Sequence, residues 1–163
     1  MEVKEVLKQV QAGEISVEDA EQFFRRQPFE EMGYAKLDTH RKIRSGFAEV
    51  IFCSGKADEH LLQIFGRLYA QDQEVFGTRA SQAQYEMIQK QYPQTIYDPV
   101  SRIIKIEKEG KTRQGKVAVC TAGTADIPVA EEAAQTAEYF GTQIERVYDV
   151  GVSGIHRLLS NLD

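Results

Sequence analysis

Two short turns in the last third of the sequence carry residue types that can hold a charged ligand. The first, T-A-G-T-A-D, follows the apolar run K-V-A-V-C, and the second, D-V-G-V-S-G, follows T-Q-I-E-R-V-Y. Small residues leave backbone N–H groups open to a ligand, and the positive end of a helix dipole favours an anion there. The two turns therefore predict a nucleotide phosphate site, with Asp126 and Asp149 as acceptors for ribose hydroxyls.

The candidate nucleotide-binding residues all lie in these two turns. They are Thr121, Gly123, Thr124, Ala125, Asp126, Asp149, Gly151, Val152, Ser153 and Gly154. Asp126 is also the best candidate for a catalytic group. Neither turn is a G-x-G-x-x-G or Walker sequence, so the motifs of dinucleotide oxidoreductases and NTPases are absent. A purely structural interpretation stays open, in which the small residues only let strands turn tightly into helices.

The segments around the turns predict the elements that position them. K-V-A-V-C is short, apolar and rich in β-branched residues, as expected of a strand that is buried on both faces. Thr124 or Asp126 can cap the next helix, whose first turn tolerates Pro128. Gly141 ends that helix, T-Q-I-E-R-V-Y-D is the next expected strand, and a helix carrying I-H-R-L-L follows the second turn.

The preceding part of the chain predicts a small α/β layer behind two short amphipathic helices. Ser16 with Asp19 three residues later predicts the cap of the second helix. Strands are expected at E-V-I-F-C, E-V-F-G-T-R, T-I-Y-D and R-I-I-K-I-E, with helices over 58–69 and 82–91. The predicted organisation is an N-terminal helical region (1–34), a small α/β domain (35–107), a charged linker (108–116) and a strand–helix–strand–helix unit (117–163).

Composition excludes several classes of partner. The 163 residues include 25 acidic and 20 basic side chains, and the formal net charge of −5 disfavours nucleic acid as a partner. No apolar run approaches the roughly 20 residues that cross a bilayer, and the start does not form a signal peptide, so a cytoplasmic protein without a membrane partner is expected. Cys53 and Cys120 each end an apolar stretch and are expected to be core thiols. No Cys/His spacing indicates a metal site.

Three blocks of the sequence resemble one family. They are L-D-T-H-R-K-I-R-S-G-F-A-E-V-I-F (37–52), T-A-G-T-A-D-I-P-V-A-E-E-A-A-Q-T-A-E (121–138) and Y-D-V-G-V-S-G-I-H-R-L-L (148–159). Together they resemble the LarB family of nickel-pincer nucleotide cofactor biosynthesis proteins, which includes proteins named circadian phase modifiers. The C-terminal domain of that family is similar to aminoimidazole ribonucleotide carboxylase. The resemblance implies that residues 117–163 form the first strand–helix–strand–helix unit of a flavodoxin-like parallel sheet.

The resemblance also implies an activity. LarB proteins are carboxylases and hydrolases that act on nicotinic acid adenine dinucleotide with carbon dioxide or bicarbonate. They release pyridinium-3,5-biscarboxylic acid mononucleotide and AMP. In the family a cysteine thiolate adds to the pyridinium ring, and that cysteine lies in a later part of the carboxylase-like domain. The resemblance therefore implies a truncated chain that is inactive alone and has no cofactor of its own, with a magnesium requirement left open.

The T-H-R-K-I-R block is a second candidate for ligand contact. Arg41 and Arg44 could meet a diphosphate, because guanidinium groups bind phosphate oxygens in pairs. The alternative is an exposed basic segment whose side chains pair with Asp38 and Glu49.

Two other functions stay open. One is a non-catalytic nucleotide-binding or assembly module. The other, an aminoimidazole ribonucleotide carboxylase of purine synthesis, is weaker because those relatives carry serines where Gly123 and Ala125 stand here. A parallel strand pair also leaves an open sheet edge, which predicts a homo-oligomer.

Overall fold

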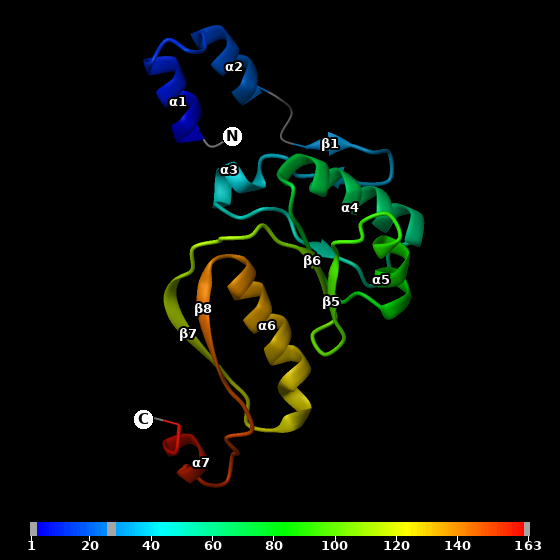
Figure 1. The fold of residues 1–163 in the computed structure, drawn as a ribbon, viewed down its shortest axis with the longest axis vertical. Helices are drawn as coiled ribbons and strands as arrows, with labels where there is room; N and C mark the ends of the chain where they lie inside the picture. Colours follow the sequence, from blue (N-terminus) through cyan, green and yellow to red (C-terminus); the bar gives the residue numbers. More distant parts are fainter. Residues whose placement is uncertain (1–2, 26–28, 162–163) are drawn as a thin grey trace. The chain divides into compact units, whose positions relative to one another are not determined.

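Short amphipathic segments make up the first of two compact units, which divide after residue 49. The structure is a computed structural model that describes residues 3–25 and 29–161. The first unit contains α1 (Val3–Gln11), α2 (Val17–Arg25), the antiparallel strands β1 (Glu30–Glu31) and β2 (Lys36–Leu37), and α3 (Arg41–Ser45) (Figure 1). Val6 and Ala20 are buried. The Ser16 hydroxyl oxygen accepts the Asp19 N–H at 3.0 Å, which confirms the predicted cap of α2.

The second unit begins with a four-stranded sheet and two helices. Its elements are β3 (Ile51–Phe52), α4 (Asp58–Asp72), β4 (Val75–Thr78), α5 (Gln82–Gln89), β5 (Ile96–Asp98) and β6 (Ile103–Ile106). The strand order is β3-β4-β6-β5, with β3 parallel to β4 and the other pairs antiparallel. α4 buries Leu61, Phe65 and Leu68 at helical spacing. Ser81 and Gln84 form a capping box that starts α5.

A strand–helix–strand–helix segment completes the second unit. β7 (Gln114–Cys120) is followed by the 3₁₀ turn η1 (Thr124–Asp126), α6 (Ile127–Tyr139), β8 (Thr142–Val147) and α7 (His156–Leu159). β7 and β8 are parallel, and their register runs to the pair Cys120–Val147. Parallel neighbours need a crossover connection, and α6 is that crossover. The α/β class with parallel strands is therefore confirmed.

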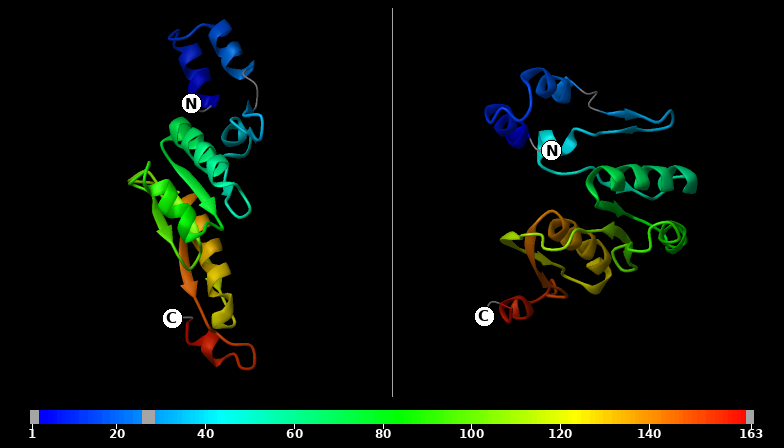
Figure 2. Two further views of the ribbon diagram at one scale, coloured as in Figure 1. Left: turned by 90° about the vertical axis from the view of Figure 1, so that its right-hand side faces the viewer. Right: turned by 45° about the horizontal axis from the view of Figure 1, so that its top comes forward.

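Helix α6 joins the two sheets of the second unit. One side of the helix contacts β7 and β8 (Figures 1 and 2). Its last residue, Tyr139, packs against Phe76 of β4 with ring centroids 4.5 Å apart, and Phe140 lies 6.1 Å from the same ring. Phe76, Tyr139 and Ile103 of β6 form one buried cluster. Apolar burial therefore holds α6 on the four-stranded sheet as well as on the parallel pair.

The prediction that K-V-A-V-C is buried on both faces is wrong for this structure. Six of the seven residues of β7 are exposed, and one of them is Cys120, which was expected to be a core thiol. The described part of the chain supplies only one neighbouring strand, β8, and one covering helix, α6. An apolar, β-branched sequence therefore has no partner on its other face.

Two expectations about the helices also need correction. Neither Thr124 nor Asp126 caps α6 with its side chain; the 3₁₀ turn leads directly into the helix. Pro128 does lie in the first turn of α6, as predicted, because its missing N–H is not needed there. The helix after the second turn has only four residues, so it supplies little of the dipole that was expected to favour an anion at that turn.

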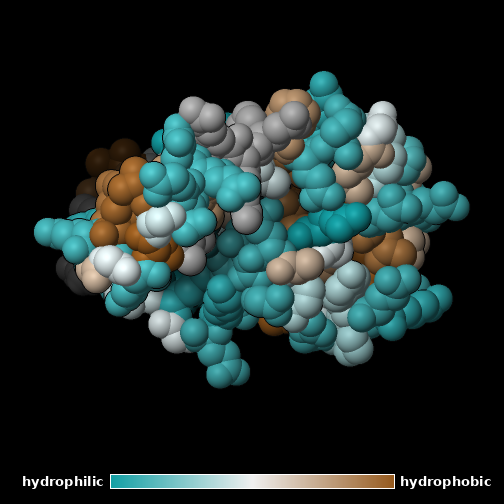
Figure 3. All heavy atoms as spheres, turned by 90° about the horizontal axis from the view of Figure 1, so that it is seen from above, coloured by the Kyte–Doolittle hydropathy of each residue, from teal (hydrophilic) through white to brown (hydrophobic). Residues whose placement is uncertain are grey.

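Figure 3 shows one face, where hydrophilic residues predominate and hydrophobic residues gather in separate patches. No helix among the described residues is both long and apolar enough to cross a lipid bilayer.

Candidate functional site

The two predicted turns lie side by side and are hydrogen-bonded to each other. The Val150 N–H donates to the Thr121 carbonyl at 3.0 Å, and the Gly151 N–H donates to the Ala122 carbonyl at 2.8 Å. The Asp149 N–H donates to the Thr121 hydroxyl oxygen at 3.1 Å. Because β7 and β8 are parallel, both turns leave the same edge of the sheet. The structure thus brings together two segments whose contacting residues, Thr121 and Asp149, are 28 positions apart in the sequence.

The first turn presents its polar groups at the start of a 13-residue helix. Thr121 is buried and faces the second turn, whereas Thr124, Ala125 and Asp126 are exposed. The Asp126 side chain makes no capping hydrogen bond, so its carboxylate is not committed to the helix. Neither the 3₁₀ turn nor α6 has a side-chain cap, but the Ile127 N–H donates to the Thr124 carbonyl and Pro128 has no N–H, so fewer backbone donors are open to an anion here than at an ordinary helix start.

The second turn depends on a left-handed backbone. Asp149 has φ 58° and Gly151 has φ 75°. A residue other than glycine in this conformation costs about 1–3 kcal/mol, so surrounding contacts must hold it. For Asp149 that contact is the hydrogen bond to Thr121. Beyond it, Val152 and Ser153 are exposed and Gly154 is half-buried.

Arg157 is a site residue that the sequence reasoning missed. Its Nη1 donates to the Asp149 carbonyl at 3.0 Å and lies 3.2 Å from Asp149 Oδ1. The guanidinium packs against Gly151, where an ideal Cβ would lie only 2.1 Å from Nη2. The positive φ favours glycine at position 151, and a Cβ there would displace the Arg157 guanidinium. The signal was a single basic residue three positions after G-V-S-G, in I-H-R-L-L.

Arg41 and Arg44 belong to the first unit. Arg44 forms an ion pair with Asp38, and this hydrogen bond holds the pKa of that carboxyl below its usual value. The Asp38 N–H in turn donates to the Glu49 carboxylate at 2.7 Å. The contacts of Arg44 favour the alternative in which this basic block pairs with nearby acids. Arg41 is exposed on α3.

The two cysteines differ in their environments. Cys53 is fully buried, and burial raises the pKa of its thiol to about 12. A thiolate is the reactive form of cysteine, so Cys53 is suited to packing and not to nucleophilic addition. Cys120 is exposed at the end of β7, directly before the first turn. Among the described residues, no group of three or more His, Cys, Asp or Glu side chains could hold a metal ion.

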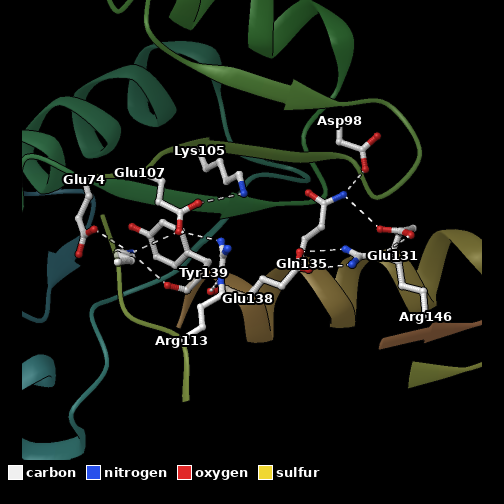
Figure 4. Close-up of polar contacts among 11 residues, drawn as sticks. Glu74, Asp98, Lys105, Glu107, Arg113, Glu131, Gln135, Glu138, Tyr139 and Arg146 are labelled. Carbon is white, nitrogen blue, oxygen red and sulfur yellow. Dashed lines mark hydrogen bonds and ion pairs between the residues drawn. The ribbon is translucent and has the colours of Figure 1, made fainter. Parts of the chain in front are cut away.

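Polar side chains connect α6 to the strand that leads into the second turn (Figure 4). Arg146 of β8 donates to both oxygens of Glu138, at 2.7 and 2.9 Å, and its Nε donates to Glu131 at 2.9 Å. Hydrogen bonding by Arg146 lowers the pKa of Glu138. The Tyr148 hydroxyl donates to Glu131 at 2.9 Å. The pKa of this tyrosine is raised, mainly by burial and also by this hydrogen bond.

The protein is thus an α/β protein in which two hydrogen-bonded turns follow a pair of parallel strands. Residues 29–109 match the LarB/PurE-like N-terminal domain. This match supports the LarB family that the sequence blocks predicted, and the block at 37–52 lies within it. An uncharacterized protein of Methanocaldococcus jannaschii, MJ0165, is 33% identical over 174 aligned residues. The alignment covers 98% of this chain, and the chain spans 66% of the length of that relative.

Proposed function

We propose that the paired turns bind nicotinic acid adenine dinucleotide and that the chain contributes this site to a LarB-type carboxylase and hydrolase. The reaction adds a carboxylate from carbon dioxide or bicarbonate to the pyridinium ring. It then splits the phosphoanhydride to give pyridinium-3,5-biscarboxylic acid mononucleotide and AMP. The family of residues 29–109 supports the class of enzyme, and the joined turns support the class of ligand.

The observation that carries the nucleotide assignment is the arrangement of groups around Thr121. One hydrogen-bonded structure places the start of α6, the exposed Asp126 carboxylate and the Arg157 guanidinium at the same sheet edge. Backbone N–H groups and a guanidinium suit phosphate oxygens, and a carboxylate suits ribose hydroxyls. Arg157 now pairs with Asp149, and a phosphate would compete for that guanidinium.

The chemistry needs a nucleophile because a pyridinium carbon is electron-poor and cannot attack carbon dioxide. A thiolate that adds to the ring converts it to an enamine, whose carbon then forms the new bond to carbon dioxide. A base later removes the ring proton, and the thiolate leaves as aromaticity returns. Cys53 cannot take this part, since its thiol is buried and its pKa is about 12.

A second candidate function is nucleotide binding without covalent chemistry. The burial of Cys53 favours it, because one of the two thiols is unable to form a thiolate near neutral pH. In this case the turns would hold the dinucleotide or AMP, and no carboxylated product would form.

Calorimetric titration of the 163-residue chain with nicotinic acid adenine dinucleotide and with AMP tests the binding site. Loss of a charge-assisted hydrogen bond is worth about 1.5–3 kcal/mol, so we expect Arg157→Gln to weaken binding about ten- to a hundred-fold. Lys90→Gln makes the same charge change at the exposed end of α5 and should leave affinity unchanged. If neither nucleotide gives a heat of binding, the proposed site is refuted.

Incubation with nicotinic acid adenine dinucleotide and bicarbonate separates the two candidates. Release of AMP together with a mononucleotide whose pyridinium ring carries one carboxylate more than the ring of the substrate supports the carboxylase and hydrolase. Binding without either product supports the non-catalytic function. Mass spectrometry of the mixture distinguishes these outcomes, because the added carboxylate and the split phosphoanhydride change mass independently.

We also propose that the chain self-associates. The exposed apolar residues of β7 and the two-stranded parallel sheet leave an edge that another copy could cover. Light scattering at micromolar concentration should therefore report more than one copy per particle, and a strictly monomeric mass would refute self-association.

A further inference from the structure

A continuous chain of polar contacts runs from the turn after β5 through α6 to the second nucleotide turn. We propose that Glu131 is a positioning residue, which holds Tyr148 and thereby the left-handed Asp149, and that Gln135 connects this support to Asp98. The consequence for ligand affinity rests on the nucleotide-binding function proposed above. The backbone consequence does not, because it concerns the free protein.

The far end of this chain is fixed by the turn that follows β5. The Asp98 carboxylate accepts hydrogen bonds from the Ser101 hydroxyl at 2.7 Å and from the Val100 N–H at 3.1 Å. Gln135 of α6 donates through Nε2 to Asp98 Oδ2 and, at 3.4 Å, to Glu131 Oε2 (Figure 4). The four-stranded sheet thus supplies a fixed acceptor to the middle of α6.

The middle of this chain of polar contacts is the Glu131 carboxylate, which accepts hydrogen bonds from two residues of the neighbouring segment. Glu131 Oε1 accepts from Arg146 Nε and from the Tyr148 hydroxyl, each at 2.9 Å. Arg146 is itself held by two hydrogen bonds from its guanidinium to Glu138. The Glu131 side chain is only 17% exposed, so its hydrogen bonds face little competition from water. Glu131 is therefore a rigid acceptor for Tyr148.

The near end of the chain is the residue that begins the second turn. Tyr148 directly precedes Asp149, whose φ is 58° and whose N–H donates to Thr121. The hydrogen bond from the Tyr148 hydroxyl to Glu131 limits how far the adjoining backbone can rotate. Without it, Asp149 should leave its costly conformation more often and open the hydrogen bonds between the turns.

Amide hydrogen exchange of the ligand-free chain tests this support directly. We expect Tyr148→Phe to speed exchange at Asp149, Val150 and Gly151 by about tenfold, as the loss of one hydrogen bond to a charged acceptor implies. The matched control is Tyr97→Phe, which removes a 3.4 Å hydrogen bond from the Tyr97 hydroxyl to the Ala80 carbonyl. Exchange in the turns should be unchanged in that control.

The link to the four-stranded sheet needs its own variant. Gln135→Met should also speed exchange at Asp149, although less than Tyr148→Phe, because Arg146 still holds Glu131. Its matched control is Gln143→Met, which removes a 3.3 Å hydrogen bond from the Gln143 side-chain amide to the Arg113 carbonyl. Unchanged exchange in Gln135→Met would overturn the link to Asp98.

A second variant and a second measurement keep the outcomes distinct. Glu131→Met keeps a similar side-chain length but removes both acceptor oxygens, and it should give the same local opening while exchange at Phe76 in the core stays slow. Unchanged exchange at Asp149 in both Tyr148→Phe and Glu131→Met would overturn the positioning role. Titration with nicotinic acid adenine dinucleotide should show weaker binding by a similar factor in Tyr148→Phe. Faster exchange in a chain that binds no nucleotide supports the positioning role and refutes only the proposed function.

Discussion

Lys111 lies in the charged segment between β6 and β7, and its substitution should uncouple the two sheets. Its Nζ donates to the Tyr139 carbonyl at 3.0 Å and lies 2.8 Å from Glu74 Oε2. The same ammonium stands 3.7 Å from the centroid of the Tyr139 ring. One cation thus meets the end of α6 and the start of β4. Segment 108–116, which was predicted to be a linker, is held at Lys111 by these contacts with Tyr139 and Glu74.

The expected cost of Lys111→Met follows from these contacts. Removing one partner of a buried ion pair costs about 3–5 kcal/mol, because the other charge stays buried. The Glu74 side chain is 10% exposed, and no other ion partner for it is found among the described residues. Lys111 is itself 23% exposed, and methionine keeps the contact with the ring. We therefore expect the free energy of unfolding to fall by about 2–3 kcal/mol.

Urea unfolding followed by circular dichroism measures this cost, and a double variant separates the ion pair from the packing. Glu74→Gln removes the charge that Lys111→Met leaves unpaired, so the double variant should be more stable than the sum of the single costs predicts, by about 1–2 kcal/mol. Strictly additive costs, or a change below about 0.5 kcal/mol in Lys111→Met, would show that the pair is solvated and contributes nothing.

Other changes test the core, the thiols and an acid-sensitive ion pair. Phe76→Ala should lower the free energy of unfolding by about 3–5 kcal/mol, because the side chain is 1% exposed and packs on the aromatic end of α6; a smaller loss than about 1 kcal/mol in urea would contradict this packing. A thiol reagent should modify Cys120 in the folded protein and reach Cys53 only in denaturant; two equally fast thiols in the native state would be inconsistent with the fold. Hydrogen bonding by Arg146 holds the pKa of Glu138 below its ordinary value of 4.5, so the carboxylate stabilises the fold above pH 4.5 and this stabilisation is lost as pH falls through the folded pKa. Glu138→Gln should therefore lose less stability on acidification than the unchanged chain, and parallel acid limbs of the two unfolding curves would disprove the coupling.

Local patterns in the sequence were sufficient for the elements and the family. The hydroxyl of Ser16 and the carboxylate of Asp19 lie three residues apart, and a cap requires only those neighbours. The strand and helix segments from β3 to β8 follow from apolar periodicity and from glycine and proline positions, which act within a few residues. The sequence blocks likewise identified the LarB family that residues 29–109 match.

Tertiary structure decided which surfaces are covered and which charges meet. Periodicity marks β7 as apolar, but its exposure depends on how many strands and helices pack against it. Gln135 meets Asp98 across 37 positions, and Arg157 reaches the Asp149 carbonyl across eight. Such contacts depend on the path of the chain between the partners, because hydrogen bonds and ion pairs act over a few ångströms. The sequence by itself therefore determined the family and the local elements, and only the fold placed Arg157 at the turns and fastened α6 between the two sheets.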